Sequence, residues 1–228
     1  MNIILSPHLD DGVFNAWHVI AKGQIKIITV FAGTPDTRKT TFWDRLGGIK
    51  SSQEMMAVRR AENKTALKDE AAEIINLNFL DHQYAHKQVD IETIWKELRK
   101  HITKQDVLFV PIAASRIFRH VDHVALRDLG VHLFNEGFRV KFYTDIPYMR
   151  IPNIVNVRYL SKLERKVKII TGLESRATVV VLDNAIFAKK RAAMRAYKTQ
   201  YRITNLSSFG SLSRKANIVH EIEIELNK

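Results

Sequence analysis

Two short runs of this sequence carry side chains of the kinds that bind catalytic metal ions. Residues 6–11 read SPHLDD and directly follow a short apolar segment, and residues 120–123 read HVDH. Three of these side chains, His8, Asp11 and His123, would together supply two imidazoles and one carboxylate. A catalytic zinc ion typically keeps three protein ligands and leaves a further position for water or substrate. The two runs therefore predict one metal site divided between distant parts of the chain.

Each run also has a simpler interpretation when it is taken alone. His8 is compatible with a capping or hydrogen-bonded loop histidine, and Asp10 and Asp11 are typical residues at the amino end of a helix. His120 and His123 are three positions apart, so they would share one face of a helix, as many surface pairs do. The joint pattern is more specific, because both runs follow a predicted strand at a strand-to-helix junction. Open α/β sheets bind their ligands at such carboxyl ends of strands.

The spacing of apolar residues predicts the elements that would bring the two runs together. Segments rich in Ile, Val and Phe alternate with segments of helical spacing. The predicted strands are 2–6, 26–31, 74–79, 106–112, 141–146, 178–182 and 219–226, and the predicted helices are 12–22, 51–72, 90–103, 122–137 and 184–202. This alternation favours an α/β fold with a mostly parallel sheet and helices on both faces. The alternating segment 219–226 is expected to be a terminal strand at an edge of the sheet.

Length and composition favour one domain. With 228 residues, 46% of them apolar, the chain can bury a sizeable core, and no internal repeat or domain boundary is evident. We therefore expect residues 1–228 to form a single domain. No run of about 18 apolar residues predicts a transmembrane helix, and the amino terminus lacks the features of a secretory signal. The sequence has no cysteine, which excludes disulfides and a cysteine nucleophile, and a cytoplasmic location is expected.

Further short runs extend the pattern along the chain. They are FAG at 31–33, WD at 43–44, RRAEN at 59–63, LNFLD at 77–81, YTDIPY at 143–148 and YKTQ at 197–200. With these runs, the sequence resembles the family of zinc-dependent N-acetylglucosamine deacetylases that includes the phosphatidylinositol-glycan deacetylases and the LmbE-like bacterial proteins. The resemblance covers residues 1 to about 202. Leu9 stands where the family's first motif usually has proline, a change that leaves every chemical group of the motif in place.

The resemblance implies a division of labour within the two runs. It implies His8, Asp11 and His123 as metal ligands, Asp10 as general base and His120 as an electrostatic or acid partner. Amide hydrolysis needs a strong nucleophile, a stabilised oxyanion and a proton for the leaving amine. Zinc can lower the pKa of its bound water to about 7 and polarise the carbonyl group. A free carboxylate beside the metal could carry the proton, a role worth roughly 10²- to 10⁴-fold in rate.

The expected metal is Zn²⁺, although His and carboxylate ligands also accept Fe²⁺ or another divalent ion. Asp122 lies between the two histidines of its run and is expected either to orient one of them or to cap the following helix. The resemblance suggests that Asp145 orients a metal-binding histidine and that Tyr148 borders the acyl site. Both residues are equally compatible with packing at the end of a strand.

Three further residues are candidates for contact with the substrate. The resemblance suggests that Arg59 or Arg60 reaches sugar hydroxyls or a substrate phosphate, work that suits the planar guanidinium fork. The alternative is an ion pair within the helix, worth a few tenths of a kcal/mol. Trp43 lies in the long polar connection 33–48, where long loops are often functional. It would then belong to a lid over the sugar, or else pack into the core or against another subunit.

The chain is strongly basic, with 36 Lys and Arg against 24 Asp and Glu and a net charge of +12. Basic residues gather at 162–168 and at Lys189, Lys190, Arg191 and Arg195. Such a charge is compatible with nucleic acid, an anionic membrane surface, an acidic substrate or merely a solvated face. No nucleic-acid-binding motif or aromatic stacking platform accompanies these residues, so nucleic acid is not the expected partner.

These observations lead to one expectation and two alternatives. We expect a Rossmann-like α/β metallohydrolase that removes an acetyl or similar acyl group from an amino-sugar conjugate. The expectation includes conjugates that carry a phosphate or a nucleotide, and the resemblance allows a homo-oligomer. The alternatives are a carbohydrate-binding protein of the same fold without turnover, and a basic module that associates with nucleic acid or membranes.

Overall fold

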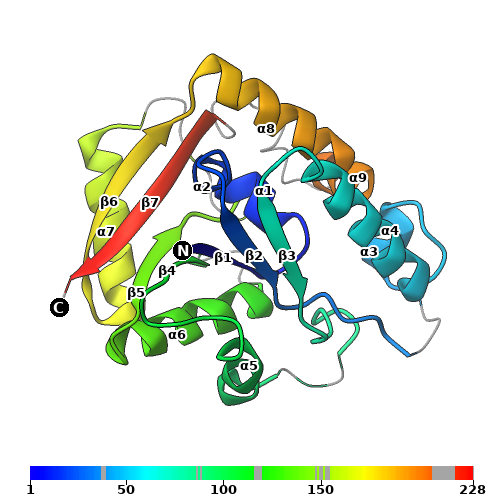
Figure 1. Ribbon diagram of the computed structural model, residues 1–228, viewed down its shortest axis with the longest axis horizontal. Helices are drawn as coiled ribbons and strands as arrows, with labels where there is room; N and C mark the ends of the chain where they lie inside the picture. Colours follow the sequence, from blue (N-terminus) through cyan, green and yellow to red (C-terminus); the bar gives the residue numbers. More distant parts are fainter. Residues whose placement is uncertain are drawn as a thin grey trace.

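Seven strands form one sheet in the computed structural model, which describes residues 1–36, 40–85, 87, 89–115, 120–146, 148, 151, 155–206 and 219–227 (Figure 1). The order across the sheet is β3-β2-β1-β4-β5-β7-β6. The strands are β1 (Asn2–Ser6), β2 (Ile25–Thr29), β3 (Ala72–Asn76), β4 (Val107–Pro111), β5 (Arg139–Tyr143), β6 (Glu174–Val181) and β7 (His220–Asn227). The first five pair in parallel, whereas β7 is antiparallel to both β5 and β6.

β1 lies in the interior of the sheet, between β2 and β4. Its residues Ile3, Ile4 and Leu5 are at most 1% exposed, because helices cover both faces of the sheet at this point. Such a continuous apolar run is typical of a parallel strand buried on both sides. β1 pairs with β2 through residues including Ser6 and Thr29, and with β4 through residues including Ile4 and Phe109. The carboxyl ends of β1 and β4 therefore lie side by side.

Helices lie on both faces of the sheet (Figure 1). α5, α6 and α7 cover one face, and α1, α2, α4 and α8 lie over the other. Their bounds are α1 (Asp11–Asn15), α2 (Trp17–Ile20), α3 (Phe42–Leu46), α4 (Ser52–Ala66), α5 (Ile91–Leu98), α6 (Val121–Asn135), α7 (Val157–Thr171), α8 (Asn184–Ala196) and α9 (Lys198–Leu206). The predicted α/β class, with a mostly parallel sheet between helices, is confirmed. None of the described helices combines the length and apolar character that crossing a bilayer requires.

The prediction that the terminal strand lies at an edge of the sheet is wrong. β7 lies between β5 and β6, and β6 is the edge strand. β7 pairs with β6 along its whole length, from Val181 opposite His220 to Glu174 opposite Asn227. The alternation of apolar residues in β7 identified a half-buried strand, but alternation carries no information about which neighbour it pairs with.

Several predicted helices end or break earlier than their apolar spacing suggested. The segment 12–22 forms two short helices separated at Ala16, and the segment 184–202 is interrupted at Tyr197. α7 was not predicted, because its many lysines and arginines obscure a narrow apolar stripe that includes the buried Leu163 and Val167. Gly172, at a φ of 75°, ends this helix in the left-handed conformation that glycine adopts readily.

Candidate metal centre

The neighbouring ends of β1 and β4 bring the two polar runs together. The first run follows β1 and leads directly into α1, which begins at Asp11, while His120 is the N-cap residue of α6. The ring of His8 lies 4.8 Å from that of His120 and 5.3 Å from that of His123, measured between centroids. Residues more than 110 positions apart in the sequence thus form one cluster at the carboxyl edge of the sheet.

His8, Asp11 and His123 form the innermost group of this cluster. Asp11 Oδ2 lies 3.1 Å from His8 Nδ1 and 3.2 Å from His123 Nε2, and all three residues are at most 5% exposed. His123 Nε2 has no hydrogen-bond partner among the described residues, although it is buried. A buried polar atom left unsatisfied costs about 1–3 kcal/mol. Three donor atoms converging within 4.8 Å of one another therefore fit a divalent metal ion, which would satisfy this nitrogen.

In each histidine of this group, the ring nitrogen that faces away from Asp11 is hydrogen-bonded to a second carboxylate. Asp122 Oδ2 accepts a hydrogen bond from His8 Nε2 at 2.9 Å, and Asp145 Oδ2 accepts one from His123 Nδ1 at 3.0 Å. Both aspartates are themselves fixed by backbone N–H donors, that of His82 to Asp122 and that of Ala113 to Asp145. Such carboxylate partners set the orientation and the free nitrogen of a metal-binding imidazole.

The partner of Asp122 differs from the one expected. Asp122 was expected to orient a histidine of its own run or to cap the helix, but it instead bonds His8 on the other run. It lies 3.8 Å from His120 Nδ1, and His120, not Asp122, is the N-cap residue of α6. The side chain of Asp122 points from the first turn of α6 across to the β1 loop, a direction that sequence spacing does not reveal.

The charges of the cluster shift the pKa values of its members. Burial lowers the pKa of His123, but the negative charge of Asp11 and the hydrogen bond to Asp145 outweigh it and raise the pKa to about 9. The pKa of His8 is likewise raised, because the aspartates around it outweigh its burial. Conversely, burial would raise the pKa of Asp11, but the two histidines hold it well below its usual range. A metal ion would take the place of these protons, because imidazole binds metals in its neutral form.

Asp10 lies beside the His8–Asp11–His123 group but makes a separate contact. Its Oδ1 accepts a hydrogen bond from Arg59 NH2 at 3.1 Å, and Arg59 NH1 donates to Asp81 Oδ2 at 3.3 Å. Arg59 is only 4% exposed, so its guanidinium is a buried bridge between two carboxylates. Burial, together with the charge of Asp11, raises the pKa of Asp10, while Arg59 opposes the shift.

Asp81 belongs to this cluster and was not among the predicted site residues. It lies 3.7 Å from His8 Nε2 and is 3% exposed. The signal was present in the sequence, because the run LNFLD at 77–81 follows β3 and ends with a carboxylate at the same edge of the sheet. Gly33, in the FAG run after β2, allows this segment to approach, since a Cβ there would lie 2.8 Å from the carbonyl oxygens of Asn78 and Phe79.

His120 and Tyr148 form an aromatic wall on the open side of the cluster. The side chain of His120 is 27% exposed, more than the other cluster histidines, and its ring lies 5.7 Å from that of Tyr148. Tyr148 also meets the ring of His123 edge to face at 4.9 Å. Burial and the positive charges of His8 and His123 lower the pKa of His120 to about 3. With the cluster in this protonation state, His120 is a neutral hydrogen-bonding group.

The other predicted substrate-binding residues lie outside this cluster. Arg60 binds Thr34 Oγ1 at 2.8 Å and the carbonyl of Ala32, so it fixes the loop after β2. Trp43 is 40% exposed on α3, which removes the interpretation that it packs into the core. α3 is nevertheless linked to the cluster, because Thr41 at its N-cap bonds Gln83, and Gln83 bonds Asp81.

The YKTQ run at 197–200 contacts both the loop after β1 and helix α4. The hydroxyl of Tyr197 lies 3.1 Å from the carbonyl oxygen of Leu9 and 2.7 Å from Asn63 Oδ1. Thr199 donates its N–H and its hydroxyl to the carboxylate of Glu62 on α4. The break between α8 and α9 thus anchors the residue that precedes Asp10 to the RRAEN helix.

Comparisons with known proteins agree with this geometry. A family model described as GlcNAc-PI de-N-acetylase (PIG-L) matches residues 3–134, which include both polar runs. No curated protein sequence matches the chain.

Solved structures share the fold at low sequence identity. The A40926 pseudoaglycone deacetylase Dbv21 has a TM-score of 0.74 at 19% identity, over 99% of this chain and 96% of its own. A triple mutant of a deacetylase of the teicoplanin biosynthetic pathway has a TM-score of 0.73 at 20% identity, over 100% and 98%. GalB, a 4-carboxy-2-hydroxymuconate hydratase from Pseudomonas putida KT2440, has a TM-score of 0.52 at 12% identity, over 100% and 95%. Proteins of different activity therefore share this fold, and the site must decide the chemistry.

Proposed function

Because the chain belongs to the GlcNAc-PI de-N-acetylase (PIG-L) family, as its short runs predicted, we propose that it is a metal-dependent N-deacetylase of amino-sugar conjugates. The observation that carries the proposal is the position of Asp10. It places a carboxylate that is free of the His8–Asp11–His123 group next to that group, and Arg59 holds it there. Membership of this family supports N-acetylated sugars as the substrate class, and the proposed reaction releases a free amine and a carboxylate.

The proposed mechanism divides the work among this chain's residues. A divalent metal held by His8, Asp11 and His123 would acidify a water molecule and polarise the acyl carbonyl. Asp10 takes the proton from the attacking water and later delivers it to the leaving nitrogen. Arg59 restrains Asp10 for this transfer. His120 faces the side on which the oxyanion develops and acts as an electrostatic partner.

Zinc is the metal we propose, with Fe²⁺ as the alternative. Two imidazoles and one carboxylate are suitable for either ion, because nitrogen and oxygen ligands of intermediate softness accept several divalent metals. The absence of cysteine removes thiolate ligands, which would have favoured zinc more strongly. The identity of the metal thus rests on the family, and the fit of a divalent metal rests on the donor atoms themselves.

The residues predicted to contact the substrate differ in whether their side chains are already bonded within the protein. Both amino groups of Arg59 already bind carboxylates, and Arg60 binds the β2 loop, which favours positioning roles over contact with a substrate phosphate. Tyr148 remains our candidate for the acyl site, since its ring contacts those of His120 and His123. We keep the exposed Trp43 as a candidate for stacking on a sugar ring. A phosphate- or nucleotide-linked substrate and a homo-oligomer remain proposals without a contact to support them.

We further propose that residues 1–228 work as one catalytic domain. The site residues come from segments between Ser6 and Tyr148, and β7 is joined to this part of the chain through Glu221, which binds the backbone of α2. A cytoplasmic location stays a prediction from the cysteine-free sequence. A binding protein without turnover is less well supported, because the donor atoms and a free carboxylate are all brought together.

Release of acetate from N-acetylated sugar conjugates tests the proposal. The protein, loaded with zinc, is incubated with N-acetylglucosamine linked to phosphatidylinositol, to a nucleoside diphosphate or to a neutral aglycone, and acetate and free amine are quantified together. We expect equal amounts of both products from at least one conjugate and none from the Asp10→Asn variant. Turnover by Asp10→Asn at the parent rate, or binding of sugars without products by the metal-loaded parent, would contradict the proposal.

A further inference from the structure

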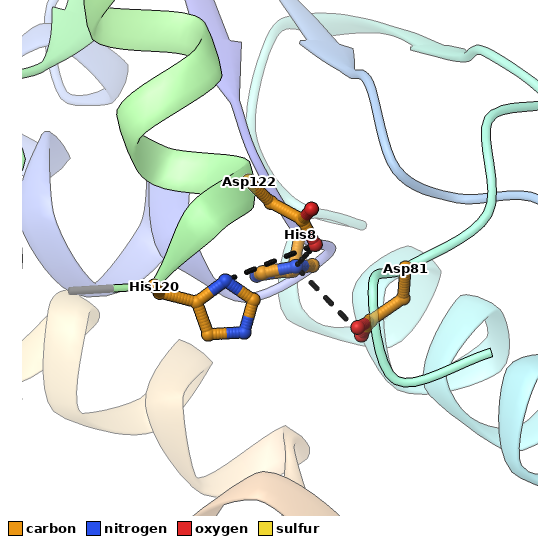
Figure 2. Close-up of side chains that lie close together, drawn as sticks. All are labelled: His8, Asp81, His120 and Asp122. Carbon is orange, nitrogen blue, oxygen red and sulfur yellow. Dashed lines mark hydrogen bonds and ion pairs between the residues drawn. The ribbon is translucent and has the colours of Figure 1, made fainter. Parts of the chain in front are cut away.

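A second group of metal-binding side chains lies on the far side of His8 (Figure 2). The first group uses His8 Nδ1, whereas the second surrounds Nε2. Asp122 Oδ2 lies 2.9 Å from this nitrogen, Asp81 Oδ2 lies 3.7 Å from it, and His120 Nδ1 lies 3.8 Å from Asp122 Oδ2. Figure 2 shows Asp122 and His120 at the start of α6, with Asp81 approaching from the segment after β3.

His120 brings an available ligand atom to this second group. Its Nδ1 is buried and has no hydrogen-bond partner among the residues described. A buried nitrogen without a partner has lost its hydrogen bond to water and has gained none within the protein, which costs free energy. A cation between His120, Asp81 and Asp122 would satisfy it.

The charge of the whole cluster also favours more than one cation. Among the residues that the structure describes, five aspartates belong to the cluster, Asp10, Asp11, Asp81, Asp122 and Asp145, and Arg59 is the one permanently charged partner seen for them. With neutral histidines, as metal binding requires, four negative charges of these described residues have no positive partner among them. A single divalent ion offsets two of these charges, and buried charges are costly unless they are paired.

We propose that Asp81, His120 and Asp122 form a second, weaker site for a divalent cation of the zinc class, separate from the His8–Asp11–His123 site. His8 lies between the two sites, with Nδ1 facing the first and Nε2 still donating to Asp122. The second site is weaker for two reasons. Its carboxylates already accept hydrogen bonds, Asp81 from Arg59 and Gln83, and Asp122 from His8 and His82. A cation there is also repelled by the first one, across a single imidazole ring.

Occupation of this site has a consequence for activity. The cation would engage His120, the residue we place beside the developing oxyanion, and would fill the space next to it. Excess zinc should therefore inhibit the enzyme after the first equivalent has activated it. This consequence depends on the proposed function, whereas the existence of the site does not.

Zinc stoichiometry under buffered free zinc tests the site without any assay of activity. The parent, His120→Ala, Asp81→Asn, His123→Ala and His82→Ala are dialysed against rising free zinc, and bound zinc per chain is measured by mass spectrometry, with circular dichroism to establish folding. His82 is the matched control, because its side chain is exposed on the turn next to Asp81. His120 is the safer of the two diagnostic positions, since its side chain makes no capping hydrogen bond to α6.

We expect two saturable equivalents in the parent and in His82→Ala. His120→Ala and Asp81→Asn should each keep the tight equivalent and lose the weak one, whereas His123→Ala should lose the tight one. One equivalent in the parent at every zinc concentration would overturn the proposal. So would a weak equivalent that survives in both His120→Ala and Asp81→Asn, or one that disappears in His82→Ala. If the zinc stoichiometries are as expected but the zinc-loaded parent has no deacetylase activity, the proposed function is overturned and the second site is not.

Discussion

Adjacent aspartates in the first run have different surroundings, and this difference defines the site. Asp11 is buried between two imidazoles, which hold its pKa low and keep it ionised as a ligand. Asp10 contacts Arg59 instead, and burial together with the neighbouring charge of Asp11 raises its pKa. A carboxylate whose pKa rises towards the working pH is better suited to carry a proton. In the proposed mechanism, one dipeptide thus provides both a ligand and a base.

Replacement of Asp10 by Asn should remove proton transfer while the metal site stays intact. We expect kcat for acetate release to fall by roughly 10²- to 10⁴-fold, the usual worth of a positioned general base, with bound metal unchanged. Steady-state kinetics and metal content of the same preparation measure the two effects. Asp69→Asn, at an exposed position, is the control and should match the parent. A rate within a few-fold of the parent would show that Asp10 is not the base.

Removal of the carboxylate behind His123 should weaken the metal site without removing a ligand. Asp145 accepts the Nδ1 hydrogen bond of His123, which fixes the ring with Nε2 towards Asp11. Loss of such a partner typically costs about 10- to 100-fold in metal affinity. We expect Asp145→Ala to show this loss in a competition titration against a zinc chelator. An affinity equal to that of the parent would mean that His123 is held by packing alone.

At the scale of the elements, the pairing of β1 with β4 and the break after α1 position the cluster. The break at Ala16 is fixed from a distant part of the sequence, because Glu221 on β7 accepts the backbone N–H groups of Trp17 and His18. Lys190 on α8, which is fully buried, binds the same carboxylate at 2.6 Å. β7 thereby caps α2 and ties α8 to the sheet. This also corrects the interpretation of Lys190 as part of a basic surface.

Glu221 should make the stability of the fold depend on acid pH. Burial would raise its pKa, but Lys190 and His18 outweigh burial and lower the pKa from 4.5 to about 2. The unfolded chain therefore binds a proton at higher pH than the folded chain. The stabilisation, about 3 kcal/mol, should be complete above pH 4.5 and be lost as the pH falls towards 2.

Urea unfolding between pH 2 and 7 measures this effect in the parent and in Glu221→Gln. The variant should be less stable at pH 7, since it leaves Lys190 buried without its anion, and its free energy of unfolding should fall less steeply below pH 4.5. Glu92→Gln, on the first turn of α5, provides a surface control. Parallel pH profiles for parent and Glu221→Gln would contradict the assignment.

At the scale of the whole molecule, the sequence predicted the fold class and the convergence of the two runs, but not the contacts between elements. β1 was predicted with its observed bounds, because Ile3, Ile4 and Leu5 form an apolar run between polar residues. The position of β7 and the partner of Asp122 were wrong, since both depend on which distant segment lies opposite. Asp81 was missed for the same reason, as a single carboxylate at a strand end becomes part of a site only through its neighbours.

The overall charge also has a different distribution from the one its composition suggests. The chain carries a net charge of +12, yet the cluster is rich in aspartate and offers ligand atoms for cations. The basic excess therefore lies outside the site, partly on α7, where Lys162 and Arg165 are exposed. Association with an anionic surface and binding of a metal ion would therefore involve different parts of the molecule and call for separate tests.

The central claim is that His8, Asp11 and His123 hold a metal ion, and metal content tests it most directly. Protein purified without added metal is analysed by mass spectrometry, and parent, His8→Ala, His123→Ala and the exposed control His82→Ala are exposed to equal zinc, desalted and analysed again. We expect about one tightly held metal ion per chain in the parent and in His82→Ala, and little in the other two variants. No metal retained by the parent, or equal amounts in all four proteins, would contradict it.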